Sequence, residues 1–221
     1  MVQLKGTVVY FDARAKAEAI RLTLAAAGAD FENKFVAFAD LATEVKGNPA
    51  EYPFAQVPRY FDGEVDLVQT QAILRYLGRR HGLAGGSVRE EALVDVLLEG
   101  IADLKSGIVP LVYRPNLQTD EAKQEHWEVH VAPEGLSTPD VRGAHVLYLQ
   151  RFIEQHGQDG FAVGGALTVA DIALFDLVSF YRQKFGGEFD ATYPALVAHH
   201  AKIAALPRIA AYLAGPLRPA K

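Results

Sequence analysis

The sequence TVVYFDARAKAEAIRLTLAAAG, residues 7–28, predicts a short buried strand, a tight turn and a helix. Val8 and Val9 are β-branched and favour a strand. Apolar residues then recur at helical spacing up to Gly28, which suits the position just after a helix. Tyr10 lies where the strand passes into the helix. Because ligands of α/β sheets bind at strand ends, Tyr10 is a candidate binding residue, although a strand aromatic without a function is the simpler interpretation of Tyr10 alone.

The composition is typical of a globular chain with an ample core. The chain has 221 residues, of which 50% are hydrophobic and 22% charged, enough for one large domain or two small ones. A net charge of -5 gives no basic surface for nucleic acid, although it is compatible with a local basic pocket for a small anion. No apolar run approaches the length of a bilayer span, so we expect a cytoplasmic protein that contacts neither nucleic acid nor membrane.

The chain contains no cysteine. This composition excludes a disulfide, a thiolate metal site and a cysteine nucleophile. Any thiol chemistry must therefore use a thiol that the substrate brings.

The first eighty residues predict the order β-α-β-loop-β-β-α. A second, weaker strand is expected within residues 30–38, and two strands flanking Asp62 and Gly63 predict a hairpin. Residues 69–81 have a helical apolar face that ends at Gly82. A crossover helix favours a parallel first pair of strands, and the hairpin adds antiparallel ones, so we expect a small mixed sheet of thioredoxin-like order.

Beyond the first eighty residues the strand patterns disappear and helical ones follow, while the charged residues 118–137, which end in a loop, are assigned to no element. The linker is expected at residues 83–88, LAGGSV, between an α/β domain at residues 1–82 and an all-helical domain at residues 89–221. Thr168 and Asp171 form a capping box before a helix that is apolar nearly all round, which predicts the buried centre of this domain.

Two further patterns concern residues 126–157. Thr138 and Pro139 favour the start of a helix that ends at Gly157. His126 and His130 have a spacing that can hold a metal on a helix, but Trp127 stands where a zinc protease would have its glutamate, and no third ligand is evident.

We therefore predict a surface pair of histidines at 126 and 130 and no metal site. The adjacent His199 and His200 cannot share one helix face and are most simply placed facing solvent.

The chain resembles the cytosolic glutathione transferases, and among them the tyrosine type of the Alpha, Pi, Mu and Sigma group. The resemblance covers nearly the whole chain. It rests on six motifs in order and spacing: Tyr10-Phe11, AEAIR at 17–21, Gln56-Val57-Pro58, VQTQAILRYL at 68–77, EGIADL at 99–104, and the Thr168/Asp171 box.

The resemblance implies a reaction in which the thiol of glutathione attacks an electrophile. A free thiol with a pKa of ~8.5 is only a few per cent thiolate at pH 7, so a donor that stabilises the anion produces nucleophile without a base. Tyr10 matches that catalytic donor.

Further residues match the glutathione site of the family. Val57, before a cis Pro58, would offer its backbone N–H and C=O to the cysteinyl unit. Gln69 and Thr70, at a helix N-terminus, would bind the γ-glutamyl carboxylate. The alternatives are an ordinary proline at a strand start and ordinary helix caps.

Other matches are partly altered. Gln56 and Lys46 resemble the groups that contact the γ-glutamyl and glycyl ends, with a solvated lysine as the alternative for Lys46. Lys16 replaces the usual arginine after the catalytic turn, and Ala15 replaces the usual glycine, so guanidinium help to the thiolate is lost or becomes that of an ammonium.

The resemblance also implies a homodimer. Asp103 matches the acidic residue that reaches the ammonium of glutathione in the other subunit. Phe54 matches the Alpha-type aromatic that inserts between helices of the partner, with an ordinary loop aromatic as the alternative.

The electrophile is expected in an apolar site between the domains. Phe11, Ala13, Ile108 and Tyr113 occupy the matching positions, and Tyr113 could assist the leaving group or pack in a core. Residues 114–138 look longer than in the family and could reshape this pocket or its rim.

The resemblance thus implies a glutathione transferase that conjugates glutathione, as its co-substrate, to hydrophobic electrophiles and needs no metal. The alternatives are a glutathione-dependent isomerase similar to prostaglandin synthases and a ligand-binding or structural protein of the same fold.

Overall fold

A computed structural model describes residues 5–133 and 144–220. The chain folds into two compact units, one made of Met1–Leu83 with Ala204–Lys221 and the other of Ala84–Ile203. Residues 204–221 thus share a unit with the N-terminal sheet. The division into domains at residues 1–82 and 89–221 stays a prediction.

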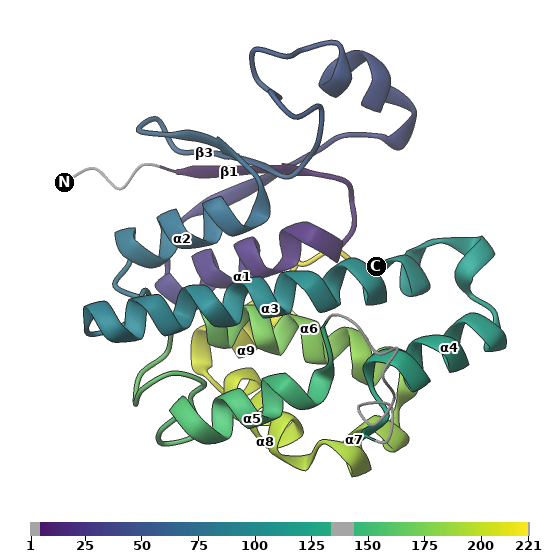
Figure 1. Cartoon of the computed structure of the whole chain (residues 1–221). Coiled ribbons are helices and arrows are strands. Elements are labelled where there is room, and N and C mark those ends of the chain that lie inside the picture. The colour runs from purple at the N-terminus through teal and green to yellow at the C-terminus, as the bar shows by residue number, and fades with distance from the viewer. Residues whose placement is uncertain (1–4, 134–143, 221) are drawn as a thin grey trace. The chain divides into compact units, whose positions relative to one another are not determined.

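The first unit contains a four-stranded mixed sheet in the order β2-β1-β3-β4. The β1–β2 pair is parallel, whereas β1–β3 and β3–β4 are antiparallel. This topology confirms the predicted mixed sheet with its terminal hairpin. Helices α1 and α2 cover one face of the sheet (Figure 1). The bounds are β1 Gly6–Tyr10, α1 Glu18–Ala27, β2 Phe31–Phe35, β3 Arg59–Phe61, β4 Asp66–Val68 and α2 Thr70–Arg80.

The connections between these elements carry most of the candidate site residues. A short 3₁₀ turn, η1 (Ala15–Ala17), joins β1 to α1, which ends at Gly28 with φ +69°. Between β2 and β3 lie η2 (Phe38–Asp40), the π-helical turn η3 (Leu41–Lys46) and a loop over residues 47–58.

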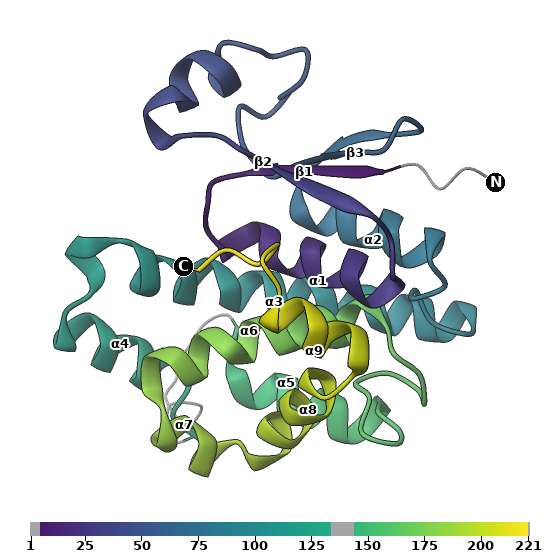
Figure 2. The same cartoon turned by 180° about the vertical axis from the view of Figure 1, so that it is seen from behind.

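The C-terminal helix α9 (Pro207–Ala214) packs against α1 (Figure 2). The hydroxyl of Tyr212 donates to Glu18 Oε2 at 3.1 Å, and Arg218 Nε donates to Glu18 Oε1 at 2.9 Å. Two groups of the C-terminal segment therefore donate hydrogen bonds to one buried carboxylate of α1.

The second unit is helical in its described residues. The long α3 (Val88–Tyr113) runs through Pro110 and packs on α6 (Val169–Phe185), which is buried along most of its length. Both bonds of the Thr168/Asp171 capping box are present at the start of α6, as predicted. The remaining bounds are η4 Pro115–Leu117, α4 Asp120–His130, α5 Val146–His156, α7 Gly187–Thr192 and α8 Pro194–Ala204. The helix start predicted at Thr138 and Pro139 lies outside the described residues. The prediction that this helix runs on to Gly157 is wrong, because α5 begins at Val146, and its N-cap His145 is extended, with φ -138° and a side chain that accepts from the N–H of Leu147.

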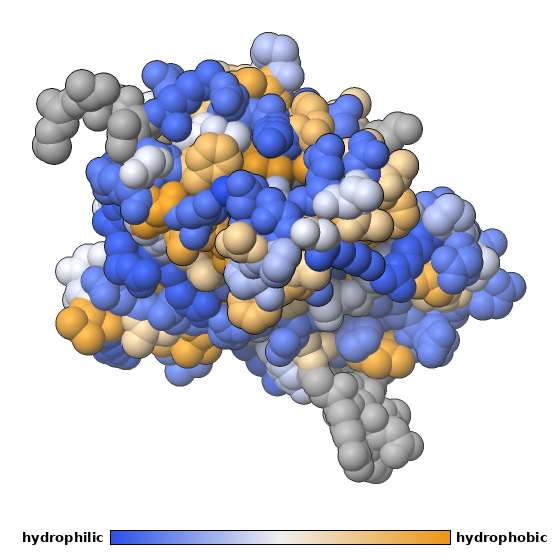
Figure 3. Space-filling view, turned by 90° about the horizontal axis from the view of Figure 1, so that it is seen from above, coloured by the Kyte–Doolittle hydropathy of each residue, from blue (hydrophilic) through white to orange (hydrophobic). Residues whose placement is uncertain are grey.

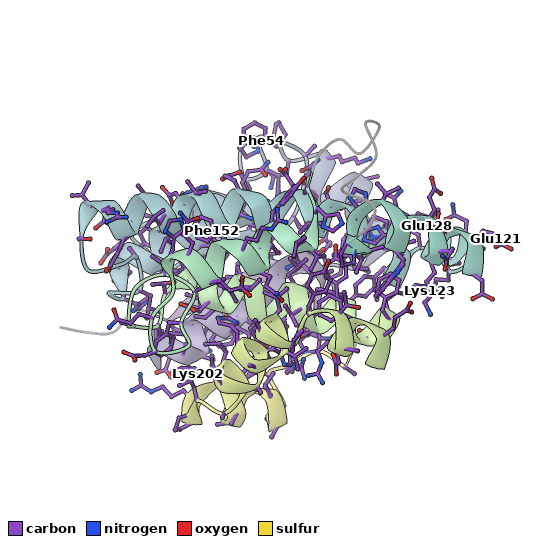
Figure 4. All side chains as sticks on the ribbon, turned by 60° about the horizontal axis from the view of Figure 1, so that its bottom comes forward. Phe54, Glu121, Lys123, Glu128, Phe152 and Lys202 are labelled. Carbon is purple, nitrogen blue, oxygen red and sulfur yellow. The ribbon has the colours of Figure 1, made fainter. Side chains whose placement is uncertain are left out.

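The prediction of a surface histidine pair on α4 is wrong. His126 is only 7% exposed, and its Nε2 lies 3.3 Å from the hydroxyl of Tyr181 on α6. Burial lowers the pKa of His126 to about 4. Glu121 and Glu128 are exposed on the outer face of α4 (Figure 4), whereas the ammonium of Lys123 lies 5.7 Å from the ring centroid of Phe185 on α6.

The prediction that His199 and His200 face solvent is also wrong. His199 is 4% exposed, and its Nε2 lies 2.9 Å from Oδ1 of the buried capping residue Asp171. The ring of His200 stacks on Phe175, with centroids 4.4 Å apart.

Over residues 5–133 and 144–220, no three His, Cys, Asp or Glu side chains gather where they could hold a metal ion. Among the helices in these same ranges, none is both long enough and apolar enough to span a bilayer.

Candidate functional site

Tyr10 ends β1 and is 5% exposed. The chain turns sharply after it, and the N–H of Ala13 donates to the C=O of Phe11 at 2.7 Å. This turn brings the backbone N–H of Lys16 to 3.4 Å from the Tyr10 hydroxyl oxygen, to which it donates a long hydrogen bond. The phenol oxygen therefore accepts a hydrogen bond from the backbone of this turn.

Thr70 approaches the same turn from the start of α2. Its Oγ1 donates to the backbone C=O of Lys16 at 3.1 Å. Two hydrogen bonds through one peptide segment thus bring together Tyr10, Lys16 and Thr70, although the side chain of Lys16 is exposed. Ala15 in this segment has φ +30°, a region that favours glycine.

Val57 lies beside the cis Val57–Pro58 peptide bond and is 9% exposed. Over residues 5–133 and 144–220, no hydrogen bond involves the backbone N–H or C=O of Val57. Backbone groups of residues this buried are normally paired, so an extended ligand could pair with this one as a strand does.

Gln69 precedes α2 with φ +74°, which is rare for a residue that is not glycine. No side chain caps the helix there, and its first turn contains no acidic residue. The unpaired N–H groups of this turn, with the helix dipole, can bind a carboxylate. Lys46, at the end of η3, and Gln56, in the loop, are exposed.

The other predicted residues are spread over both units. Asp103 is exposed on α3, Ile108 is fully buried, and the Tyr113 ring lies edge-on to Phe180 with centroids 6.2 Å apart. Phe54 is 62% exposed, and its ring stands out from the loop (Figure 4).

An aromatic row extends from Tyr10, and sequence reasoning found only its first two members. The ring centroids of Tyr10 and Phe11 lie 5.1 Å apart, and those of Phe11 and Phe38 lie 5.8 Å apart. Phe38 is 78% exposed. Apolar side chains reach the surface between hydrophilic ones on the face seen in Figure 3. No local pattern reveals Phe38, because its contact depends on the path of the chain after β2.

Arg21 on α1 was also missed. Its side chain is fully buried, with Nη1 donating to the C=O of Ala13 at 2.9 Å and Nε donating to Asn33 Oδ1 at 2.7 Å. Glu18, one turn earlier, lies 3.5 Å from Nη1. The i, i+3 spacing of Glu18 and Arg21 was the available signal. Arg21 therefore supports the turn after Tyr10 from within the core.

Comparison with known proteins gives concordant matches. The family model described as "Glutathione S-transferase, N-terminal domain" matches residues 6–79, and "Glutathione S-transferase, C-terminal domain" matches residues 102–216. Human glutathione S-transferase A1 and rat glutathione S-transferase alpha-1 are each 32% identical over 209 residues, which is 95% of this chain and 88% of theirs.

Solved structures agree in fold. A glutathione S-transferase from Ascaris lumbricoides has a TM-score of 0.78 and 27% identity, with 98% of each chain covered. A Pi-class enzyme from Onchocerca volvulus has a TM-score of 0.77 and 24% identity, covering 95% of this chain and 92% of that one.

Proposed function

The chain belongs to the glutathione S-transferase family, and from that premise we propose that Tyr10 is its catalytic residue, donating a hydrogen bond to the sulfur of glutathione. The protein is a glutathione transferase that joins this sulfur to electrophiles. The proton of the thiol passes to solvent, the thiolate attacks the electrophilic carbon, and in a substitution the leaving group departs with its electron pair.

The observation that carries this role is a pair of hydrogen bonds made by the backbone of Lys16. Its N–H donates to the Tyr10 hydroxyl oxygen, and its C=O accepts from Thr70 Oγ1. Because the phenol oxygen accepts from the Lys16 N–H, its own proton becomes a better donor. Each unit by which the site lowers the pKa of the thiol corresponds to ~1.4 kcal/mol of thiolate stabilisation.

We propose that glutathione lies along Val57, with its γ-glutamyl carboxylate at the N–H groups that start α2. The unpaired backbone of Val57 and the positive φ of Gln69 support this placement. Strained backbone of this kind persists where it serves a site. Lys16, Lys46 and Gln56 are proposed to contact the ends of the tripeptide.

The remaining roles are proposals carried by the sequence motifs. Phe11, Ala13, Ile108 and Tyr113 would contact the electrophile. A homodimer would place Asp103 at the glutathione of the other subunit and Phe54 in its interface. We also propose a cytoplasmic location.

The replacement Tyr10→Phe tests the central role. We expect slower turnover of an activated aryl halide and a higher pKa of the bound thiol, followed through thiolate absorbance against pH, while glutathione still binds. Tyr76→Phe is the matched control, because that hydroxyl donates to Asp62 at 2.8 Å on the hairpin. An unchanged thiol pKa in Tyr10→Phe would refute the role of Tyr10.

A further inference from the structure

Arg59 opens β3 directly after the cis proline, and its side chain is only 9% exposed. Its Nε and Nη2 donate to the two carboxylate oxygens of Asp66 on β4 at 2.7 and 2.5 Å. Its Nη1 donates to Glu51 Oε2 in the preceding loop at 2.5 Å. One guanidinium thus joins the loop of residues 47–58 to the neighbouring strand, using a fork geometry that lysine lacks.

Two aromatic rings enclose the same guanidinium. Its central carbon lies 5.3 Å from the centroid of Tyr52 and 4.9 Å from that of Phe61. Tyr52 is 4% exposed, so this part of the loop is anchored rather than solvated. Hydrogen bonding to Asp66 raises the pKa of Arg59, and the residue stays charged in spite of its burial.

The two segments that Arg59 joins are those proposed to hold glutathione. The loop ends in Val57 and passes through Ala55, which has φ +52°. An alanine keeps this conformation only where surrounding contacts hold it. Strand β4 ends at Val68 and leads directly into Gln69 at the start of α2.

We propose that Arg59 is a positioning residue that fixes the loop of residues 47–58 against β4 and thereby sets the affinity for glutathione without touching it. This inference rests on the proposed function. The ordering of the loop is completed when the protein folds, so glutathione binding does not have to supply that free energy. We call the contacts of Arg59 with Glu51, Asp66 and the two rings the clamp. Loss of the clamp should weaken glutathione binding. Turnover at saturating glutathione and the pKa of the bound thiol, which depend on Tyr10, should change little.

The test compares Glu51→Gln with Glu64→Gln. Both carboxylates accept from an arginine at 2.5–2.6 Å and are about half exposed, but Glu64, in the hairpin turn, pairs with Arg80 at the end of α2 instead of Arg59. Calorimetric titration with glutathione and steady-state kinetics give Kd, KM and kcat. Since exposed ion pairs are weak, we expect Glu51→Gln to raise Kd and KM about two- to fivefold, with Glu64→Gln unchanged.

Arg59→Met should raise Kd about tenfold or more, because it removes both ion pairs and the contacts with the rings. Arg59→Lys should restore only part of the affinity. If Arg59→Met fails to fold, Glu51→Gln still decides. Equal Kd values for Glu51→Gln and Glu64→Gln would overturn the clamp, as would a loss confined to kcat or a shifted thiol pKa. Absence of glutathione binding by the unaltered protein would overturn the proposed function and the clamp with it.

Discussion

The replacement Glu18→Gln should destabilise the protein far more than its small change in shape suggests. The carboxylate of Glu18 is 1% exposed and accepts hydrogen bonds from Arg218 Nε at 2.9 Å and from the Tyr212 hydroxyl at 3.1 Å. Nη1 of Arg21 lies 3.5 Å from the same carboxylate. Glutamine keeps the volume but removes the negative charge. Arg21, which is fully buried, would then keep only the neutral oxygens of Asn33 and Ala13 as acceptors.

The magnitude follows from burial. Removing one partner of a buried ion pair costs ~3–5 kcal/mol, because the other charge stays in the core without compensation. Proteins are stable by only ~5–15 kcal/mol, so this is a large fraction of the total. Arg218→Ala removes one charge-assisted bond from a side chain that is 25% exposed, and should cost ~1–2 kcal/mol. The expected ranking therefore places Glu18→Gln well above Arg218→Ala.

Urea unfolding monitored by circular dichroism gives these free energies. Trp127, the single tryptophan, lies in the other unit and reports separately whether that unit stays folded. Glu32→Gln is the matched control, because Glu32 pairs with Lys5 at 2.5 Å but is 53% exposed, and its replacement should cost much less free energy of unfolding. If Glu18→Gln cost no more than Glu32→Gln, the reasoning from the buried network would be refuted.

Three further changes have defined outcomes. Ala15→Gly should raise the free energy of unfolding in urea by ~0.5–1 kcal/mol, because relief of the positive φ exceeds the entropy lost with glycine, and a destabilised variant would contradict this. Phe38 pairs with Phe11, which is proposed to contact the electrophile, and aromatic pairing contributes ~0.5–1.5 kcal/mol. Phe38→Leu should therefore raise KM for an aryl halide about two- to tenfold and leave KM for glutathione unchanged. Phe35→Leu, which replaces another exposed ring, should leave both KM values unchanged. Burial lowers the pKa of His126 to about 4 in the folded protein, compared with ~6.5 in the unfolded chain. Between these two values the unfolded chain binds one proton more than the folded protein. The free energy of unfolding therefore falls by ~1.4 kcal/mol per pH unit as the pH drops from ~6.5 to ~4. The urea midpoint of His126→Gln should lose that part of the slope, and an unaltered slope would contradict the assignment.

Local signals were sufficient for the fold. The Asp62–Gly63 turn, the Thr168/Asp171 capping box and the stop at Gly28 each depend on a few neighbouring residues, and all three are present. Their order along the chain then leaves few ways to arrange a small mixed sheet with helices. This is why the architecture could be predicted from one sequence.

The errors concern polar residues whose burial depends on distant partners. His126 is buried by Tyr181 on α6, and Glu18 by groups about two hundred residues later in the chain. Arg59 forms a pair with Asp66 that becomes visible only when the register of β3 and β4 is known. A charged or titratable side chain has no sequence signature for burial, because the compensating charge can come from anywhere in the chain.

The first turn after Tyr10 contains both departures from the family pattern, Ala15 and Lys16. Replacement of an arginine by Lys16 indicated a weaker stabilisation of thiolate, on the assumption that the side chain supplies it. In the structure the Lys16 backbone N–H contacts the phenol and its C=O accepts from Thr70, while the ammonium is exposed to solvent. A backbone group does this regardless of the side chain. Ala15 also bears on this contact, since its backbone conformation, with φ of +30°, helps to direct the next N–H. The glycine that the family has there would adopt this conformation without strain, and so the departure at Ala15 concerns backbone energy, whereas the departure at Lys16 concerns charge.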